Sequence, residues 1–114
     1  MKVCELDTPA LLVDREIMMD NIRAMQNRAN RKGVALRPHT KTHKTPAIAL
    51  IQRDCGCKGI AVAKLGEAEV MADAGFDDIF IANEIVGDIK MKRLRKLAQS
   101  IKLSWGIDCP DHVE

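Results

Sequence analysis

Short runs of apolar residues alternate with longer amphipathic stretches along the whole chain. The short runs predict strands near residues 10–13, 34–41, 59–63, 79–82 and 101–107. Between them, apolar residues recur every three or four positions, and this spacing predicts helices. Nearly continuous apolar strands that are separated by helices are typical of a parallel sheet with both faces covered. The pattern therefore predicts an α/β fold, built as an open sheet or as a closed barrel.

Residues that favour helix starts and stops border the amphipathic stretches. The expected helices follow Asp14, begin at Thr45–Pro46, run from about Gly66 to Ala74 and begin at Asp88. Aspartate and threonine caps accept N–H groups that the first helical turn leaves unpaired, and proline fits the first helical position. Glycine shortly after an amphipathic stretch, as at position 33, is a common helix stop.

The composition limits the classes of protein to consider. The 114-residue chain is 46% hydrophobic and 30% charged, as expected for one small globular domain. Its net charge is only +2, with both signs interspersed, so neither a nucleic acid nor a membrane surface is an expected partner. No segment approaches the roughly 20 apolar residues of a membrane span. The N-terminus lacks the apolar core of a secretory signal, so we expect a cytoplasmic protein.

The residues 37–44 have the sequence Arg-Pro-His-Thr-Lys-Thr-His-Lys. If this segment is extended, Arg37, His39, Lys41 and His43 share one face, because side chains alternate along a strand. Neighbouring cations and burial both disfavour the charged form of a lysine. A neutral amine is what Schiff-base chemistry with an aldehyde cofactor requires. Lys41, at the carboxyl end of an expected strand, is therefore the candidate reactive residue.

The neighbours of Lys41 have more than one interpretation. His39 and His43 either contact a cofactor and tune Lys41 or serve as structural hydrogen-bonding residues. Arg37 either holds an acidic cofactor group or forms a buried ion pair. The opposite strand parity of Lys44 predicts a position outside the pocket.

The same edge of the sheet is expected to carry Lys64, Asn83 and Asp108. Glu67 is expected near this edge as well. Helix capping and hydrogen bonding within loops are sufficient reasons for Glu67 and Asn83, so neither is assigned to the site.

Other chemical motifs are weak or missing from the sequence. Cys55 and Cys57 form a close pair, but a second pair is needed for a strong zinc signature. The glycines occur singly, so no phosphate-binding glycine loop is present. The residues by themselves lead to an α/β domain with a candidate reactive lysine.

Three segments resemble successive blocks of one enzyme family. They are residues 8–14 (Thr-Pro-Ala-Leu-Leu-Val-Asp), residues 37–44 and residues 59–69 (Gly-Ile-Ala-Val-Ala-Lys-Leu-Gly-Glu-Ala-Glu). Residues 75–79 and 81–87 continue the match, and the last of these blocks favours the aldolase branch. The chain thus resembles the D-threonine aldolase and D-serine dehydratase group of pyridoxal-phosphate enzymes, which is related in fold to alanine racemase.

The resemblance implies a fold. The family has a (β/α)8 barrel of the alanine racemase N-terminal domain kind and a smaller β domain. Residues 1–114 are expected to form the N-terminal part, about half of the barrel, with a lead-in strand at residues 11–13 and about four barrel strands. The second half barrel and the β domain, with the family's divalent-metal ligands, are expected to lie outside this chain. No metal ligand is therefore assigned here, and the isolated chain is expected to be inactive.

The resemblance also implies a function. Lys41 would form the internal aldimine with pyridoxal 5'-phosphate, and Arg37, His39 and His43 are the further candidate cofactor contacts. The cofactor acts as an electron sink for a D-β-hydroxy amino acid, which an aldolase cleaves to glycine and an aldehyde. The alternatives are a D-serine or D-3-hydroxyaspartate dehydratase, which releases an oxo acid and ammonia, and a non-catalytic pyridoxal-phosphate binder of the same barrel type. A homo-oligomer is also compatible with the sequence.

Overall fold

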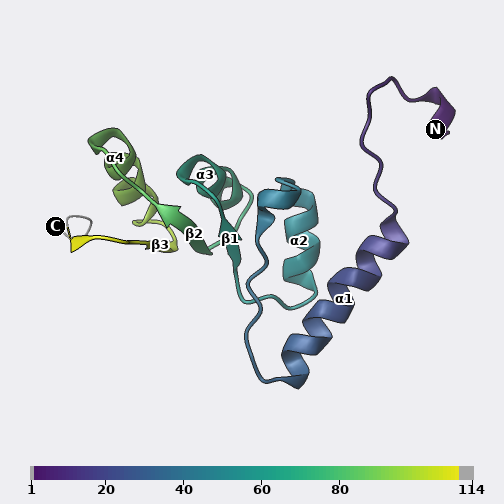
Figure 1. Ribbon diagram of the computed structural model, residues 1–114, viewed down its shortest axis with the longest axis horizontal. Helices are drawn as coiled ribbons and strands as arrows, with labels where there is room; N and C mark the ends of the chain where they lie inside the picture. Colours follow the sequence, from purple (N-terminus) through teal and green to yellow (C-terminus); the bar gives the residue numbers. More distant parts are fainter. Residues whose placement is uncertain (1, 111–114) are drawn as a thin grey trace.

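A parallel sheet with helices in its crossovers forms the centre of the fold. The computed structural model describes residues 2–110. Its elements are η1 (Val3–Glu5), α1 (Arg15–Arg31), η2 (Thr40–Thr42), α2 (Pro46–Asp54), β1 (Ile60–Val62), α3 (Leu65–Asp73), β2 (Asp78–Glu84), α4 (Asp88–Leu97) and β3 (Lys102–Gly106). The three strands pair in parallel in the order β1-β2-β3, connected through α3 and α4 (Figure 1). The expected α/β fold is confirmed.

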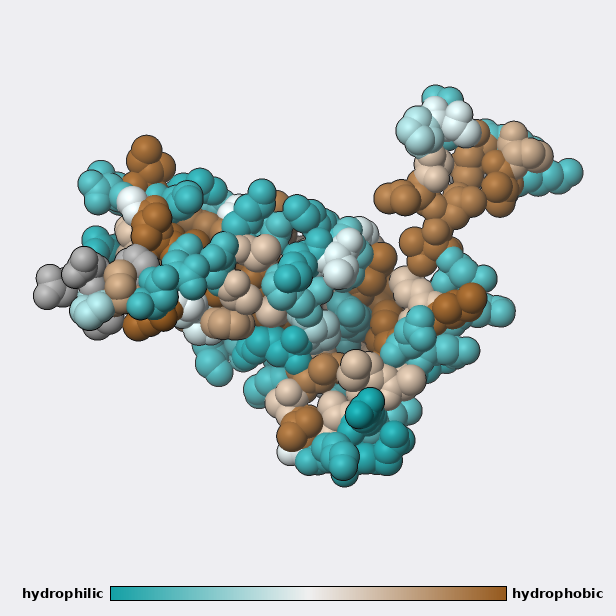
Figure 2. All heavy atoms as spheres, viewed as in Figure 1, coloured by the Kyte–Doolittle hydropathy of each residue, from teal (hydrophilic) through white to brown (hydrophobic). Residues whose placement is uncertain are grey.

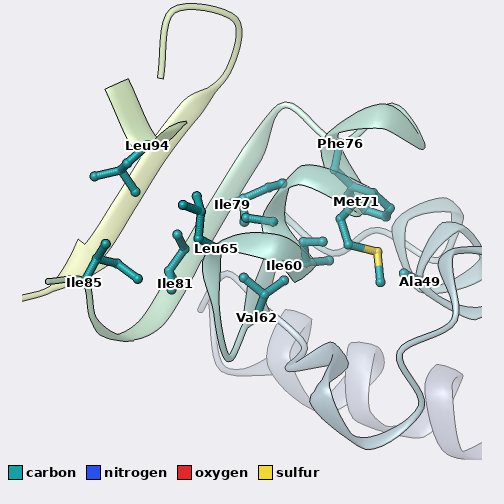
Figure 3. Packing of buried hydrophobic residues seen from close by; sticks show 11 residues of the cluster. Ala49, Ile60, Val62, Leu65, Met71, Phe76, Ile79, Ile81, Ile85 and Leu94 are labelled. Carbon is teal, nitrogen blue, oxygen red and sulfur yellow. The ribbon is translucent and has the colours of Figure 1, made fainter. Parts of the chain in front are cut away.

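The core lies between the sheet and its helices. Ile60 and Val62 of β1 and Ile79 and Ile81 of β2 are fully buried. Side chains from α2, α3, α4 and the connecting segments complete this cluster (Figure 3). Each fully buried isoleucine or valine contributes about 1.5–3 kcal/mol relative to an exposed position. Ile60 and Val62 pair in register with Ile79 and Ile81, so these buried side chains share one face of the sheet, against which the helices pack.

The strands expected at residues 59–63, 79–82 and 101–107 are confirmed as β1, β2 and β3. The strand expected over residues 34–41 is wrong, because this segment forms only one parallel bridge, between His39 and Ala61. Pro38 has no N–H to donate to a ladder. Its carbonyl still accepts the Ala61 N–H at 2.8 Å, so the segment lies beside β1 before the chain turns into η2.

The lead-in strand expected at residues 11–13 is also absent from the structure. Residues 10–14 are assigned to no regular element, and Figure 1 shows the segment before α1 as an arm that extends away from the sheet. Leu11 is fully exposed, and apolar atoms cover much of this arm in Figure 2. No described strand lies beside the arm, so its backbone has no ladder to join.

The helix starts agree with the sequence in part. The Asp14 carboxylate accepts the Ile17 N–H at 3.0 Å, so the cap expected for α1 is confirmed. Thr45 precedes α2 as expected, but its hydroxyl donates to the His43 carbonyl instead of capping the helix. Asp88 is the first helical residue of α4 and Gly87 takes the cap position, so the cap expected at Asp88 is wrong.

Gly59 lies where the chain that enters β1 passes close to β2. A Cβ at this position would be 2.5 Å from the Asp78 carbonyl oxygen and 2.7 Å from Nη1 of Arg37. We expect Gly59→Ala to lower the free energy of unfolding by about 1–3 kcal/mol, because backbone and guanidinium must shift to admit the methyl group. Urea unfolding measures this change. Gly66→Ala is the control, because the nearest atom there is 4.0 Å away; equal midpoints for both variants would contradict the prediction.

Candidate functional site

One edge of the sheet gathers the residues that the sequence singled out. Lys64 lies two residues after β1, Asn83 lies near the end of β2 and Asp108 follows β3, as expected. In parallel α/β folds, ligands bind at the edge where the strands have their carboxyl ends. The Thr40 hydroxyl donates to the Ala61 carbonyl at 3.3 Å, which holds η2 against β1 near this edge.

Lys41 occupies the middle of η2, and its side chain is exposed. Its backbone N–H donates to Nδ1 of His39 at 3.2 Å. Within residues 2–110, no carboxylate forms an ion pair with the Lys41 ammonium, and its Nζ takes part in no hydrogen bond. The amine is therefore accessible to an incoming electrophile without first breaking an internal contact.

Lys44, three residues further on, is held differently. Its N–H donates to the Thr40 carbonyl at 2.7 Å, and its Nζ lies 3.2 Å from Oε1 of Glu67. Both residues line a cavity of about 260 Å³ together with Thr40, Lys64, Gly66, Val70 and Met71. Lys41 does not line this cavity, and η2 breaks the strand alternation from which a position of Lys44 outside the pocket was expected.

Glu67 is a residue near this edge to which the sequence assigned no functional role. Its Oε2 accepts the Ala63 N–H at 2.8 Å, so the side chain reaches back from the first turn of α3 to the end of β1. Burial raises the pKa of Glu67, but the Ala63 N–H and the Lys44 and Lys64 ammonium groups outweigh it and lower the pKa below its usual value. The available signal was its spacing: a glutamate three residues after the cap residue Lys64 can reach back to a backbone N–H at the helix start.

The two histidines hold the turn through their Nδ1 atoms. Nδ1 of His39 accepts the Lys41 N–H, and Nδ1 of His43 accepts the Thr45 N–H at 3.0 Å. His39 lines a cavity of about 310 Å³ and His43 one of about 450 Å³; each is bounded in part by α1. Neither ring lines the cavity that contains Lys44 and Glu67. The hydrogen bonds match the structural interpretation of both histidines.

Lys41 influences the protonation of His39. Burial, followed by the Lys41 ammonium, lowers the pKa of His39 below its ordinary 6.5, and Glu67 acts in the opposite direction. The folded state therefore binds this proton less readily than the unfolded state, so the contribution of neutral His39 to stability is lost as the pH falls below 6.5. We expect Lys41→Met to raise the pKa of His39, as measured by NMR titration of the ring. Lys90→Met on α4 should leave it unchanged, and an equal shift in both variants would contradict the assignment.

Arg37 lies at the other edge of the sheet. Its Nη2 is 2.8 Å from Oδ1 of Asp78, and its Nη1 donates to the carbonyls of Ile60 and Asp78. Ile60 and Asp78 are the first residues of β1 and β2, so this contact is at the amino ends of the strands. Burial raises the pKa of Asp78, but Arg37 and Lys102 outweigh this effect and lower it. The ion pair, one of the two interpretations of Arg37, is the arrangement observed.

The described part of the chain contains neither a metal-ligand cluster nor a membrane-spanning helix. Within residues 2–110, no group of three or more His, Cys, Asp or Glu side chains is placed to hold a metal ion. Among the helices of the same range, none is both long and apolar enough to cross a membrane.

A comparison of this α/β chain with known protein families identifies the class of protein to which it belongs. The model of the family "Alanine racemase, N-terminal domain" matches residues 13–114, and the chain therefore belongs to this family. The expected resemblance is confirmed. So is the fold class, an N-terminal part of a barrel domain of the alanine racemase kind.

Two individual relatives are enzymes, an aldolase and a dehydratase. The chain is 45% identical over 106 residues to a D-threonine aldolase from Arthrobacter sp, covering 93% of this chain and 28% of that protein. It is 48% identical over 77 residues to D-threo-3-hydroxyaspartate dehydratase from Delftia sp. (strain HT23), covering 68% of this chain and 20% of the relative.

A solved structure gives the same result. The crystal structure of D-threonine aldolase from Filomicrobium marinum superimposes with a TM-score of 0.95 and 40% identity, covering 97% of this chain and 30% of that chain. The chain thus spans less than a third of the length of these relatives. The proteins named here are aldolases and dehydratases, which confirms the expected membership in an enzyme family.

Proposed function

We propose that this chain is the N-terminal part of a pyridoxal-phosphate-dependent lyase for D-β-hydroxy amino acids, and that Lys41 binds the cofactor covalently. The observation that carries the proposal is the accessible amine of Lys41, which has no ion-pair partner within residues 2–110, at the ligand-binding edge of a parallel sheet. Its relatives of 45% and 48% identity are an aldolase and a dehydratase. Pyridoxal phosphate supplies both activities with an electron sink that weakens the bonds of the substrate α carbon.

The residues around Lys41 fit an aldehyde cofactor. An aldehyde condenses with an amine that it can reach, and an ion pair with a carboxylate holds an amine in place. Lys41 has no such partner within residues 2–110, whereas Lys44, in the same turn, is paired with Glu67. Of the two lysines in this turn, Lys41 is therefore the one that an aldehyde can reach without breaking an ion pair. Lys44 and Lys64 line the adjacent cavity, where their positive charge favours anionic groups such as a phosphate or a carboxylate.

The other residues of the turn fix the backbone that carries Lys41. The Thr40 hydroxyl anchors η2 to the Ala61 carbonyl. His39 accepts the Lys41 N–H, and the lowered pKa of the ring favours its neutral form, which can accept at Nδ1 and carry its proton at Nε2. These contacts fix the backbone from which the Lys41 side chain projects. Arg37 contributes at a distance, by tying this segment to the amino ends of β1 and β2.

The aldolase reaction is our first choice and the dehydratase reaction the second. The D-threonine aldolase match extends over 93% of this chain, whereas the dehydratase match of 48% identity extends over 68%. The reactions separate cleanly by product. An aldolase converts D-threonine to glycine and acetaldehyde, and a dehydratase converts it to 2-oxobutyrate and ammonia.

The deciding experiment uses the full-length polypeptide, by which we mean this chain extended to the length of its relatives. We expect glycine and acetaldehyde from D-threonine in the presence of pyridoxal phosphate, and no reaction with L-threonine. Borohydride reduction followed by peptide mapping should label Lys41 and leave Lys44 unlabelled. Formation of 2-oxobutyrate would establish the dehydratase. Labelling of Lys41 without turnover of D-amino acids would indicate a non-catalytic cofactor-binding protein, and labelling elsewhere would overturn the proposal.

A further inference from the structure

The backbone of Lys44 adopts an unusual conformation. Its φ is 49°, and it is the only non-glycine residue with a positive φ in the part of the chain that the structure describes. This left-handed region is unfavourable for residues with a Cβ, so it persists only where other contacts enforce it. The turn closes through the Lys44 N–H to the Thr40 carbonyl, and Lys41 lies inside it. The conformation of Lys44 thus determines how the turn that presents Lys41 ends.

Glu67 contacts the side chain of Lys44. Its side chain is only 11% exposed, and its two oxygens are divided between two partners. Oε2 accepts the Ala63 N–H at the end of β1, and Oε1 faces Nζ of Lys44 at 3.2 Å. Glu67 also lies in the first turn of α3, where the helix dipole favours a carboxylate. One carboxylate therefore joins the sheet, a helix start and the Lys41 turn.

The pair also has a chemical consequence. Lys41 and Lys44 are two amines in one five-residue turn, and either could in principle condense with an aldehyde. Pairing with Glu67 directs the Nζ of Lys44 toward α3 and holds it in an ion pair. Without the carboxylate, Lys44 would lose the contact that separates its amine from that of Lys41.

We propose that Glu67 is a positioning residue for Lys41: its ion pair with Lys44 fixes the turn of residues 40–44 and keeps Lys44 from competing for the cofactor aldehyde. This inference rests on the function proposed above. Glu67 acts through Lys44, which lines the same cavity, and through the backbone that joins Lys44 to Lys41.

The test uses full-length Glu67→Gln, which keeps an acceptor for the Ala63 N–H but removes the charge opposite Lys44. We expect the affinity for pyridoxal phosphate, measured by absorbance titration, to fall about tenfold, because a charge-assisted contact is lost. Borohydride labelling should then divide between Lys41 and Lys44. Glu69→Gln is the matched control, because Glu69 lies on the same helix but pairs with Arg93 of α4. It should keep the affinity and the single label.

Variants of Lys44 keep the inference testable if Glu67→Gln does not fold. Lys44→Met should weaken cofactor binding to a similar extent, and Lys44→Arg should restore it, because a guanidinium pairs with Glu67 but does not condense with the aldehyde. In the Lys44→Met background, Glu67→Gln should have little additional effect.

The possible failures are separable. If the unsubstituted protein is not labelled at Lys41, the proposed function fails, and this inference fails with it. If the unsubstituted protein is labelled at Lys41 but folded Glu67→Gln keeps its full affinity and a single label, the inference alone is overturned. Equally tight cofactor binding by Lys44→Met and Lys44→Arg would also overturn the inference alone.

Discussion

Lys41→Met in the full-length polypeptide is expected to abolish covalent binding of pyridoxal phosphate and to lower the rate of D-threonine cleavage about a thousandfold or more. Methionine keeps much of the length of the side chain but has no amine to condense with the cofactor. Because Lys41 has no ion-pair partner within residues 2–110, its removal leaves no unpaired carboxylate behind. The loss should therefore appear without a comparable loss of stability. Absorbance of the bound cofactor and a glycine assay measure the two effects.

Two controls separate charge from chemistry. Lys41→Arg keeps the positive charge but cannot condense at neutral pH, so it should lose as much activity as Lys41→Met. Lys58→Met removes an exposed lysine that precedes β1, on the side of the sheet opposite Lys41, and should have no effect. Survival of both the bound chromophore and D-threonine cleavage in Lys41→Met would show that another residue binds the cofactor.

Ile79→Ala is expected to give the largest loss of stability. Ile79 is completely buried in β2, the central strand of the described sheet, opposite Ile60 of β1 and Leu103 of β3. Removing the larger side chain loses its transfer free energy and leaves a cavity that the surrounding strands cannot fill by local collapse. The free energy of unfolding should fall by about 2–5 kcal/mol, as measured by urea unfolding.

The same substitution on the surface provides the control. Ile89 on α4 is 78% exposed, so Ile89→Ala removes the same atoms from a position that is largely in contact with water. Its effect should stay within about 0.5 kcal/mol. If Ile79→Ala also changed stability by so little, the packing described for the centre of the sheet would be incorrect.

Local sequence patterns predicted the elements that depend on short apolar runs or on contacts within a few residues. Ile60, Val62, Ile79 and Ile81 lie in short apolar runs, and they form β1 and β2 as expected, with their side chains buried against the helices. Asp14 caps α1 because its carboxylate reaches an N–H only three residues away. The same rules did not predict the end of the strand expected over residues 34–41. There the missing N–H of Pro38 and the η2 turn interrupt the ladder after a single bridge.

The candidate site was also predicted only in part. The motif identified Lys41 as the candidate reactive residue, and the structure places it at the expected edge of the sheet. The alternation argument then failed at Lys44, because side-chain parity holds only in extended backbone. The contact of Arg37 with Asp78 spans 41 residues of sequence, so no local pattern contains it. The position of Glu67 in the first turn of a helix is a local signal, but its pairing with Lys44 depends on the tertiary fold.

The contacts described around Lys41 are made by residues that precede β2 in the sequence. Thr40 meets Ala61, 21 residues further along the chain, and Lys44 meets Glu67 at the start of α3, so both contacts span less sequence than the 41-residue contact of Arg37 with Asp78. Residues beyond α3 supply none of these contacts. During translation, the turn can therefore assemble as soon as α3 has left the ribosome, before β2, α4 and β3 have been synthesised. The nascent polypeptide would then acquire the amine-bearing turn first and build the rest of the sheet onto it.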